Sequence, residues 1–360
     1  MKVDNMKRCT KCVLPETYPD ISFDEDGVCT HCQSFQPIVY KGETALREVF
    51  KKSFSQSEWD CLVPLSGGRD STYTLYQLVN KYGLRALAYN YDNGFVENVA
   101  RDNIQNIADR LKVEVVYRKS EEDLQCKNIK YLTEMNIKKS PGHVQAFLCS
   151  GCRNGIWGGA HQVAREKNIP LVIFGESSME SGGFKKILSP KFTPTATEKL
   201  SFLLRMPLNF YHRKKIYRKL EKEFPSSSTQ DSKVTQVNFF DYEEWNEESI
   251  MSVIQKELDW QHKSEQSSWR FDCQIHALVN RMVYQLFGMT EKDELYSKLI
   301  REGQITREQA LEYISANEDE KERELEIIDI VLERMNLNGR EKDIIRSFCQ
   351  GSPKFKNSWE

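Results

Sequence analysis

The sequence predicts an α/β protein built on a doubly wound parallel sheet, with a small cysteine-rich unit before it and a mostly helical region after it. Three observations support this fold class. Short apolar runs alternate with helical stretches from residue 60 to about residue 225. Two CxxC pairs lie near the N-terminus, and the chain beyond residue 233 reads mostly as helix. We therefore expect three units, which are 1–40, 41–225 and 226–360.

Composition limits the class of protein. The chain has 360 residues, which is long for one core, and its formal net charge of −2 excludes a polycation that coats nucleic acid. The basic stretch 212–222 keeps local RNA binding open, although nucleic acid is not the expected partner. No run approaches the roughly 18 apolar residues of a membrane helix, and the first residues lack the apolar core of a signal peptide. We expect a cytoplasmic protein without a membrane partner.

The first unit, 1–40, is predicted to be a zinc ribbon. Cys9 and Cys12 form one CxxC pair, Cys29 and Cys32 form another, and 16 residues separate the pairs. This spacing is typical of four-cysteine zinc sites. Four thiolates around a tetrahedral ion supply folding energy that so short a segment lacks, and they leave no open position for catalysis. The alternative is four reduced thiols in a loop.

The remaining elements are predicted in chain order from apolar runs, helical periodicity and turn residues. The expected elements are a helix over 41–57, a strand over 60–65, a helix over 71–82 ended by Gly83, a strand over 85–92, a helix over 97–111, a strand over 113–118, a helical region, and a fourth strand over 169–176. The polar stretch 224–233 is a boundary or loop. Beyond it, Thr306 to Gln309 fits a helix capping box, 324–335 has helical spacing, and Asn338-Gly339 leads into a last helix.

The stretch SGGRDS connects the first strand to its helix and has the composition of an anion-binding turn. Glycines let backbone N–H groups approach an anion, and a helix start adds its positive dipole end. Asp70 would repel a phosphate unless Mg²⁺ bridges the two. The stretch is not a Walker A loop. The residues expected to bind this ligand are Ser66, Gly67, Gly68, Arg69, Asp70, Ser71 and Thr72.

SGGRDS resembles the SGGxDS pyrophosphate loop of the PP-loop ATP pyrophosphatases, a family with a HUP-like fold. The resemblance implies that ATP and Mg²⁺ bind here, and that Asp70 and Ser71 take part in adenylating an oxygen atom with release of pyrophosphate. It also implies that the loop after the second strand cradles the nucleotide, although a simple Asn-Gly turn is the alternative. Further cofactor contacts are then expected from Asp92, Asn93, Gly94, Gly175 and Glu176.

A positive group should neutralise the departing pyrophosphate. The sequence offers several cations without distinguishing among them, and we take Lys185 as the catalytic candidate. The full set is Lys185, Lys186, Lys199, Arg213 and Lys214.

A second cysteine set consists of Cys149 and Cys152 in CSGC, with Cys273 much later. This arrangement is similar to that of PP-loop tRNA-thiolating enzymes, in which three thiolates hold a [4Fe-4S] cluster with one open iron site. The alternative is that Cys273 is a buried helix residue and that the CxxC pair is structural or redox-active. Cys61 and Cys126 receive no role.

The combination of the cysteine ribbon, PLSGGRDST, YDNGF, FLCSGCRNGI and REGQITREQAL resembles the N-acetyl sugar amidotransferases of bacterial O-antigen, pseudaminic acid and legionaminic acid pathways. The resemblance implies conversion of an acetamido group on a nucleotide-activated N-acetyl sugar to an acetamidino group. It also implies a separate glutaminase and a cyclase-like ammonia-channelling subunit as partners. The competing hypothesis is a sulfurtransferase. A third, a catalytically inactive nucleotide-binding scaffold, is disfavoured by the intact SGGRDS.

Overall fold

The structure is a computed structural model that describes residues 6–120, 143–180, 234–262 and 269–351. Several predicted features lie outside these described residues. They are the cations Lys185, Lys186, Lys199, Arg213 and Lys214, the basic stretch 212–222, the polar stretch 224–233 and Cys126.

The described residues contain a five-stranded sheet in which neighbouring strands run parallel, in the order β3-β2-β1-β4-β5. The strands are β1 (Cys61–Pro64), β2 (Ala86–Asp92), β3 (Val115–Lys119), β4 (Leu171–Phe174) and β5 (Thr235–Asn238). The predicted α/β class and parallel sheet are confirmed. Because β1 pairs with β2 on one side and with β4 on the other, the strand order reverses at β1. In sheets of this kind a ligand crevice forms at that point, outside the carboxyl ends of the strands.

Strand β5 was not predicted, although the chain beyond residue 233 is mostly helical as expected. It extends the sheet by pairing with β4, with Thr235 opposite Leu171 and Asn238 opposite Phe174. Its sequence, TQVN, holds one apolar residue and so lacks the pattern of a buried strand. The strand forms because the edge of β4 provides backbone hydrogen-bond partners, which no local pattern reveals.

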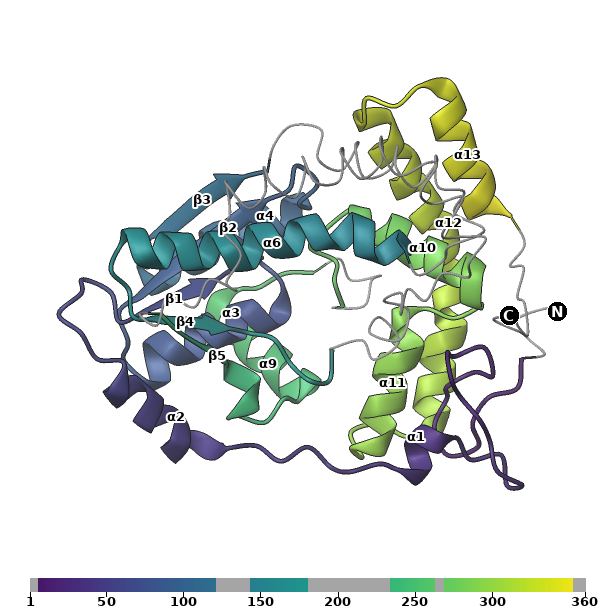
Figure 1. The fold of residues 1–360 in the computed structure, drawn as a ribbon, viewed down its shortest axis with the longest axis horizontal. Coiled ribbons are helices and arrows are strands. Elements are labelled where there is room, and N and C mark those ends of the chain that lie inside the picture. Colours follow the sequence, from purple (N-terminus) through teal and green to yellow (C-terminus); the bar gives the residue numbers. More distant parts are fainter. Residues whose placement is uncertain (1–5, 121–142, 181–233, 263–268, 352–360) are drawn as a thin grey trace, which may run out of the picture.

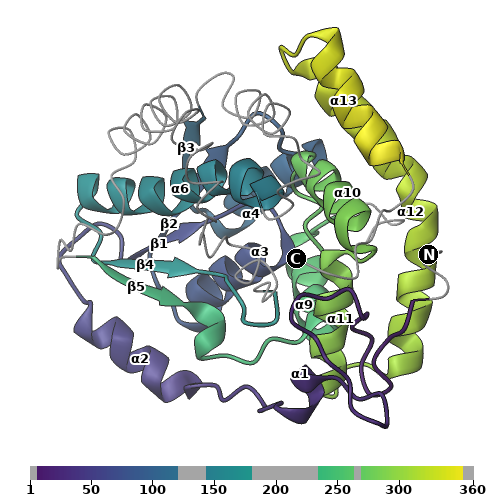
Figure 2. The same cartoon turned by 45° about the vertical axis from the view of Figure 1, so that its right-hand side comes forward.

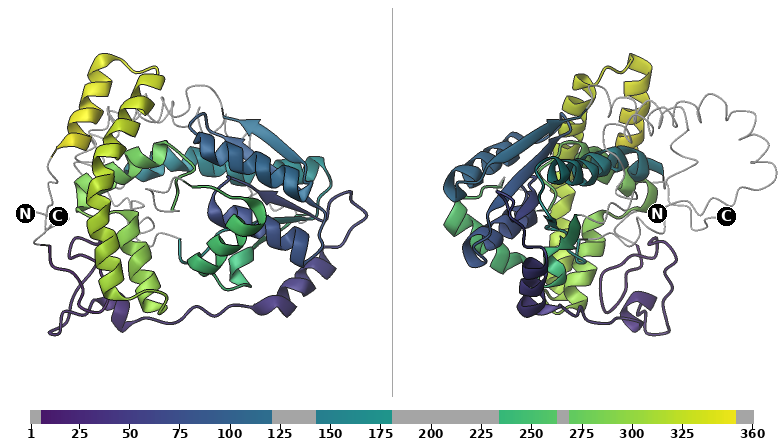
Figure 3. Two further views of the ribbon diagram at one scale, coloured as in Figure 1. Left: turned by 180° about the vertical axis from the view of Figure 1, so that it is seen from behind. Right: turned by 60° about the vertical axis from the view of Figure 1, so that its left-hand side comes forward.

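Helices cover both faces of the sheet, as the doubly wound prediction requires. Helix α6 (His143–Glu166) packs its Ala160 and Val163 on one face and lies in front of the sheet in Figure 1. Helices α3 (Arg69–Tyr76), α4 (Asn98–Leu111) and α9 (Glu247–Leu258) share the core of the other face. In Figure 3, left, which views the molecule from behind, α4 and α9 lie in front.

Two predicted helices differ from the structure in their ends. Helix α2 (Gly42–Lys52) stops earlier than the expected 41–57. Helix α3 begins at Arg69 and continues as a π-helix over Gln77–Lys81, a change in backbone winding that side-chain periodicity does not reveal. Gly83 follows with a positive φ of 68°, the left-handed conformation that favours glycine after a helix.

The C-terminal region is helical, as predicted. Its helices are α10 (Ile275–Phe287), α11 (Glu291–Arg301), α12 (Arg307–Arg334) and α13 (Gly339–Gln350). The capping box at Thr306 and Gln309 is present, and Asn338 caps α13. Figure 2 shows α13 extending from the end of α12 at the edge of the molecule.

The N-terminal ribbon packs against these C-terminal helices. It contains the short helix α1 (Thr30–Gln33), and its four cysteines share a hydrophobic core with Leu278 of α10 and Val331 of α12. Arg8 also pairs with Asp293 of α11 at 2.6 Å. In the described part of the chain, no helix combines the length and apolar character needed to cross a membrane.

Candidate functional site

The SGGRDS turn lies between β1 and α3 and is held from outside by two other segments. Gly67 has a φ of +81°, and a Cβ at this position would lie 2.2 Å from the carbonyl oxygen of Ala100 on α4. This position therefore requires glycine. The Gly67 carbonyl accepts hydrogen bonds from Trp260 Nε1 (2.9 Å) and from Asn103 Nδ2 (3.2 Å). These contacts fix the backbone of the turn before any ligand binds.

Two of the predicted hydroxyl groups close around Gly68. The Gly68 N–H donates to Ser66 Oγ at 3.2 Å, and Ser66 Oγ lies 3.3 Å from Ser71 Oγ. Both serines line the cavity above the turn. Thr72, in contrast, is fully buried, so its side chain lies in the protein interior.

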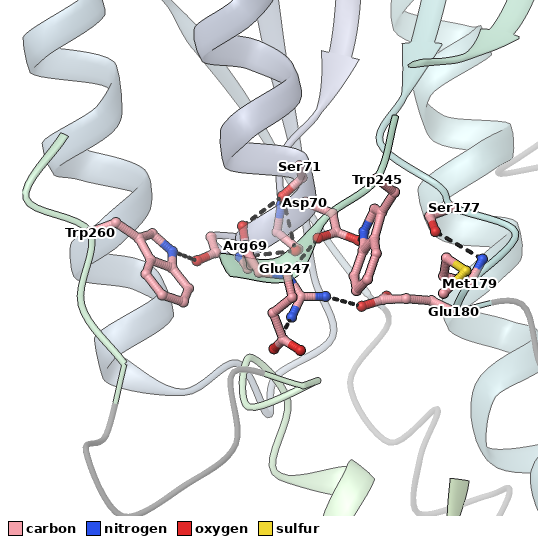
Figure 4. A network of polar contacts seen from close by, with 12 residues as sticks. Arg69, Asp70, Ser71, Ser177, Met179, Glu180, Trp245, Glu247 and Trp260 are labelled. Carbon is pink, nitrogen blue, oxygen red and sulfur yellow. Dashed lines mark hydrogen bonds and ion pairs between the residues drawn. The ribbon is translucent and has the colours of Figure 1, made fainter. Parts of the chain in front are cut away.

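Arg69 forms a buried polar network beneath the turn, shown in Figure 4. Its guanidinium group contacts Asp70 Oδ1 (2.7 Å), Glu247 Oε1 (2.6 Å) and the Glu180 carboxylate, and lies 4.8 Å from the ring centre of Trp245. Burial lowers the pKa of Arg69, but the three carboxylates outweigh this effect and raise it, so the group stays charged.

Asp70 is engaged on both carboxylate oxygens. Oδ1 accepts from Arg69 Nε, and Oδ2 accepts from Trp245 Nε1 at 2.9 Å. The expected Mg²⁺ bridge from Asp70 stays a prediction, and the structure shows this side chain directed into the network.

Glu180, at the edge of the network, has a raised pKa. Burial and the Asp70 carboxylate raise the pKa of Glu180 from 4.5 to about 8, while the Arg69 and Arg270 guanidiniums oppose the shift. A carboxyl group with a raised pKa binds its proton more tightly in the folded chain than in the unfolded chain. The stabilisation that comes from protonated Glu180 is therefore complete below pH 4.5, and it is lost as the pH rises through about 8.

We expect Glu180→Gln to lessen the fall in thermal stability between pH 4.5 and about 8, because the amide does not titrate. The measurement is the unfolding temperature across this range. Glu333→Gln is the control. Hydrogen bonds from Lys342 and Arg346 lower the pKa of Glu333 below 4.5, so this substitution should change the pH dependence of stability only in more acidic solution. An unchanged pH dependence in Glu180→Gln would contradict the assignment.

The loop after β2 bends at Asn93 and Gly94 and is held by hydrogen bonds from its own side chains. Asp92 accepts from the Gly94 N–H (2.8 Å) and pairs with Arg101 at 2.8 Å. Burial opposes ionisation of Asp92, but these hydrogen bonds lower its pKa overall. Asn93 Oδ1 accepts from the Phe95 N–H at 2.9 Å. Asp92 is thus held by the turn and by Arg101, whereas Asn93 lines the cavity.

A cavity of about 350 Å³ opens at the carboxyl ends of β1, β2 and β4, where the fold predicts a crevice. Its volume is in the range of small-molecule sites. Residues that line it include Ser66, Asn90, Gly175, Glu176, Arg270 and Asp272.

Gly175 and Glu176 both line this cavity, and their contact with a nucleotide or metal stays a prediction. A Cβ on Gly175 would lie 2.9 Å from the carbonyl oxygen of Asp70, so close packing of β4 on α3 requires glycine here. Glu176 Oε1 accepts a hydrogen bond from Trp157 Nε1 at 3.0 Å.

Two cysteines of the second set meet in the same cavity. Asn93 Nδ2 donates to Cys273 Sγ at 3.2 Å and to Cys152 Sγ at 3.6 Å, and both thiols line the cavity. The side chain of Cys149, one turn before Cys152 on α6, lies outside the described residues. Burial raises the pKa of the Cys273 thiol. The two described thiols thus lie at the cavity within reach of one amide donor.

Sequence reasoning missed Arg270 and Asp272. Both lie in WRFDCQIH (269–276), where the sequence predicts a role only for Cys273. Arg270 has a φ of +47°, a backbone conformation that is uncommon for residues other than glycine. The signal available was the grouping of an arginine, an acid and a cysteine within four residues.

The four cysteines of the ribbon can hold a metal ion. All four Sγ atoms lie within 4.8 Å of one another, with Cys9–Cys32 at 3.9 Å and Cys12–Cys29 at 3.7 Å. Zinc–sulfur bonds of about 2.3 Å in a tetrahedron place sulfur atoms about 3.8 Å apart. Backbone N–H groups of Cys12 and Cys29 donate to Cys9 Sγ. The thiols are buried and fit a structural site.

Arg307, in the REGQITREQAL motif, contacts the first CxxC turn of the ribbon. It is the first residue of α12, and its Nε donates to the carbonyl oxygens of Cys9 (3.1 Å) and Cys12 (2.9 Å). This contact holds the first CxxC turn against the C-terminal helices.

Comparison with known proteins adds a match in the C-terminal region. Residues 265–360 match the family described as LPS biosynthesis protein WbpG-like, C-terminal domain. These residues include α10 to α13 and the segment 269–276 at the cavity. No curated protein matches the chain.

Among solved structures, one match is the U34-tRNA thiolase NcsA from Methanococcus maripaludis with its [4Fe-4S] cluster. It is 13% identical, with a TM-score of 0.34, and the alignment covers 86% of this chain and 89% of that one. Another is an NMN synthetase from Francisella tularensis, which is 19% identical with a TM-score of 0.24, covering 37% of this chain and 56% of that one. Both scores are low, so the fold assignment rests on the sheet itself.

Proposed function

We propose that this protein is an ATP-dependent amidotransferase. It would adenylate the acetamido oxygen of a nucleotide-activated N-acetyl sugar and replace that oxygen with nitrogen from ammonia, giving an acetamidino sugar for bacterial lipopolysaccharide. One observation carries the proposal. The cavity is lined jointly by the SGGRDS turn and by residues 270–273 of the region that matches the WbpG-like family.

The proposed reaction has two steps, adenylation of the amide and displacement of AMP by ammonia. The amide oxygen attacks the α-phosphorus of ATP, pyrophosphate leaves, and an adenylated imidate remains. Ammonia then adds to the imidate carbon and AMP departs with the original oxygen. The protein accelerates both steps by holding the reactants together. The Gly68 N–H, the hydroxyls of Ser66 and Ser71, and Arg270 would stabilise the pyrophosphate charge.

The proposal includes the cofactors and partners that the resemblance implies. ATP and Mg²⁺ would bind at the turn, and Zn²⁺ would fill the four-cysteine site. A separate glutaminase and a cyclase-like subunit would deliver ammonia. The reaction would take place in the cytoplasm, without nucleic acid or a membrane as partner.

Sulfur transfer is a second candidate, because Cys152 and Cys273 line the cavity and share the Asn93 amide as a hydrogen-bond donor. Sulfide would then replace ammonia as the nucleophile, and a [4Fe-4S] cluster on Cys149, Cys152 and Cys273 would carry it.

One assay separates the two candidates. The purified protein is incubated with ATP, Mg²⁺, isotopically labelled ammonium and a panel of acetamido sugar nucleotides. Amidotransfer predicts AMP, pyrophosphate and a sugar in which labelled NH replaces oxygen, detected by mass spectrometry. Sulfur gained by a tRNA, with no amidine from any sugar, would reject the amidotransferase proposal.

Gly68→Ala is expected to lower kcat/KM at least about tenfold, equivalent to about 1.4 kcal/mol of lost transition-state stabilisation. The new methyl would lie 3.1 Å from Ser66 Oγ and 3.4 Å from Asp272 Oδ2, in the space above the turn. Gly339→Ala is the control, because a Cβ there meets nothing within 4 Å. Wild-type ATP affinity and turnover in Gly68→Ala would show that phosphate does not bind at the turn.

A further inference from the structure

The carboxylates that line the cavity differ in how strongly the protein itself engages them. Asp70 accepts hydrogen bonds on both oxygens, Glu180 pairs with Arg69, and Glu176 accepts from Trp157. For Asp272, the described part of the chain records no hydrogen bond or ion pair at the side chain. Of the four carboxylates named, Asp272 is therefore the one that the described residues leave without a partner, and the most open to a ligand.

Asp272 lies directly over the turn. A Cβ built on Gly68 would lie 3.4 Å from Asp272 Oδ2 and 3.7 Å from its Cγ. The same hypothetical atom would lie 3.1 Å from Ser66 Oγ. The carboxylate and the serine hydroxyl thus approach one small space, which exists because residue 68 has no side chain.

The backbone holds Asp272 in this place. The Glu97 N–H donates to the Asp272 carbonyl oxygen at 3.1 Å, and the Gln274 N–H donates to the Phe95 carbonyl oxygen at 2.9 Å. Val96 and Cys273 form an antiparallel bridge between these two bonds. The carboxylate is therefore positioned by the loop that joins β2 to α4, before ligand binding.

A carboxylate at a phosphate-binding turn repels the phosphate unless a cation lies between them. Mg²⁺ is commonly bound by one or two carboxylates together with substrate phosphates. We propose that Asp272, rather than Asp70 of the turn, is the carboxylate that binds the divalent cation accompanying ATP. This inference rests on the ATP binding of the proposed function and assigns its metal ligand to the region that matches the WbpG-like family.

The test measures metal binding without turnover. Mn²⁺ is titrated into the full-length protein with α,β-methylene-ATP, which resists cleavage at the α–β position, and free Mn²⁺ is followed by electron paramagnetic resonance. Asp272→Asn is expected to weaken Mn²⁺ binding at least tenfold without lowering the unfolding temperature. The same variant should bind the metal-free analogue at least as well as the wild type, because one repelling charge is gone.

Two further variants make the result specific. Glu176→Gln removes the same charge from the same cavity and should weaken Mn²⁺ binding far less than Asp272→Asn. Asp70→Asn should lower the unfolding temperature, because the Arg69 network loses a partner, yet keep Mn²⁺ binding when assayed below that temperature.

The proposal is overturned if Asp272→Asn binds Mn²⁺ like the wild type, if Glu176→Gln loses as much affinity, or if folded Asp70→Asn loses binding while Asp272→Asn keeps it. A wild type that does not bind Mn²⁺ with the analogue also overturns it. A wild type that binds both but yields no amidine rejects the proposed reaction alone and leaves the metal assignment standing.

Discussion

Arg69→Met is expected to destabilise the folded protein by about 3–5 kcal/mol, the usual cost of removing one partner from a buried ion pair. The Arg69 side chain is 2% exposed and neutralises charge from Asp70, Glu180 and Glu247. Without it, Asp70, Glu180 and Glu247 stay close together with no cation between them. The network also joins the turn to α9 and to the chain after β4, so nucleotide affinity should fall with stability.

Chemical denaturation followed by circular dichroism measures this effect. Lys51→Met is the matched control, because it removes a cation from an exposed pair with Glu48 (72% and 49% exposed) and should change stability little. Equal free energies of unfolding for Arg69→Met and Lys51→Met would contradict the prediction that the buried Arg69 network stabilises the fold.

Loss of the ribbon metal is expected to have the second large effect. Cys12→Ser should abolish metal binding, and the loss of stability should exceed the roughly 0.5–3 kcal/mol of an ordinary substitution. The reason is the position of the thiols, which share a hydrophobic core with α10, α12 and α13. Removing the ion leaves unpaired thiols within that core, so the damage should spread to the C-terminal helices.

Elemental analysis and hydrogen exchange test this prediction. The wild type should carry about one zinc per chain, and Cys12→Ser should lose it, with faster exchange in α10 and α12. Cys61→Ala is the control, because Cys61 is a buried thiol of β1, outside the ribbon, and should leave the metal content unchanged. Retained zinc in Cys12→Ser would reject the ribbon as a metal site.

Much of the fold was predictable because its signals are local. The apolar composition of β1, β2 and β4 matches their complete burial, and the two CxxC pairs bring their thiols close through short turns. Strand β5 and the π-helix Gln77–Lys81 were not predictable, because an edge strand depends on its neighbour and local winding depends on packing.

Some features of the candidate site were likewise predictable from the sequence, and others depended on the tertiary structure. The sequence alone determined that a glycine turn with flanking hydroxyls joins a buried strand to a helix, since backbone freedom and hydrogen-bonding capacity belong to the residues themselves. Only the tertiary structure decided which acid faces the ligand. Asp70 meets Trp245, 175 positions away, whereas Asp272 comes to the turn through its backbone bond to Glu97. A carboxylate is more open to a metal where fewer nearby donors engage it, and those donors come from distant parts of the chain.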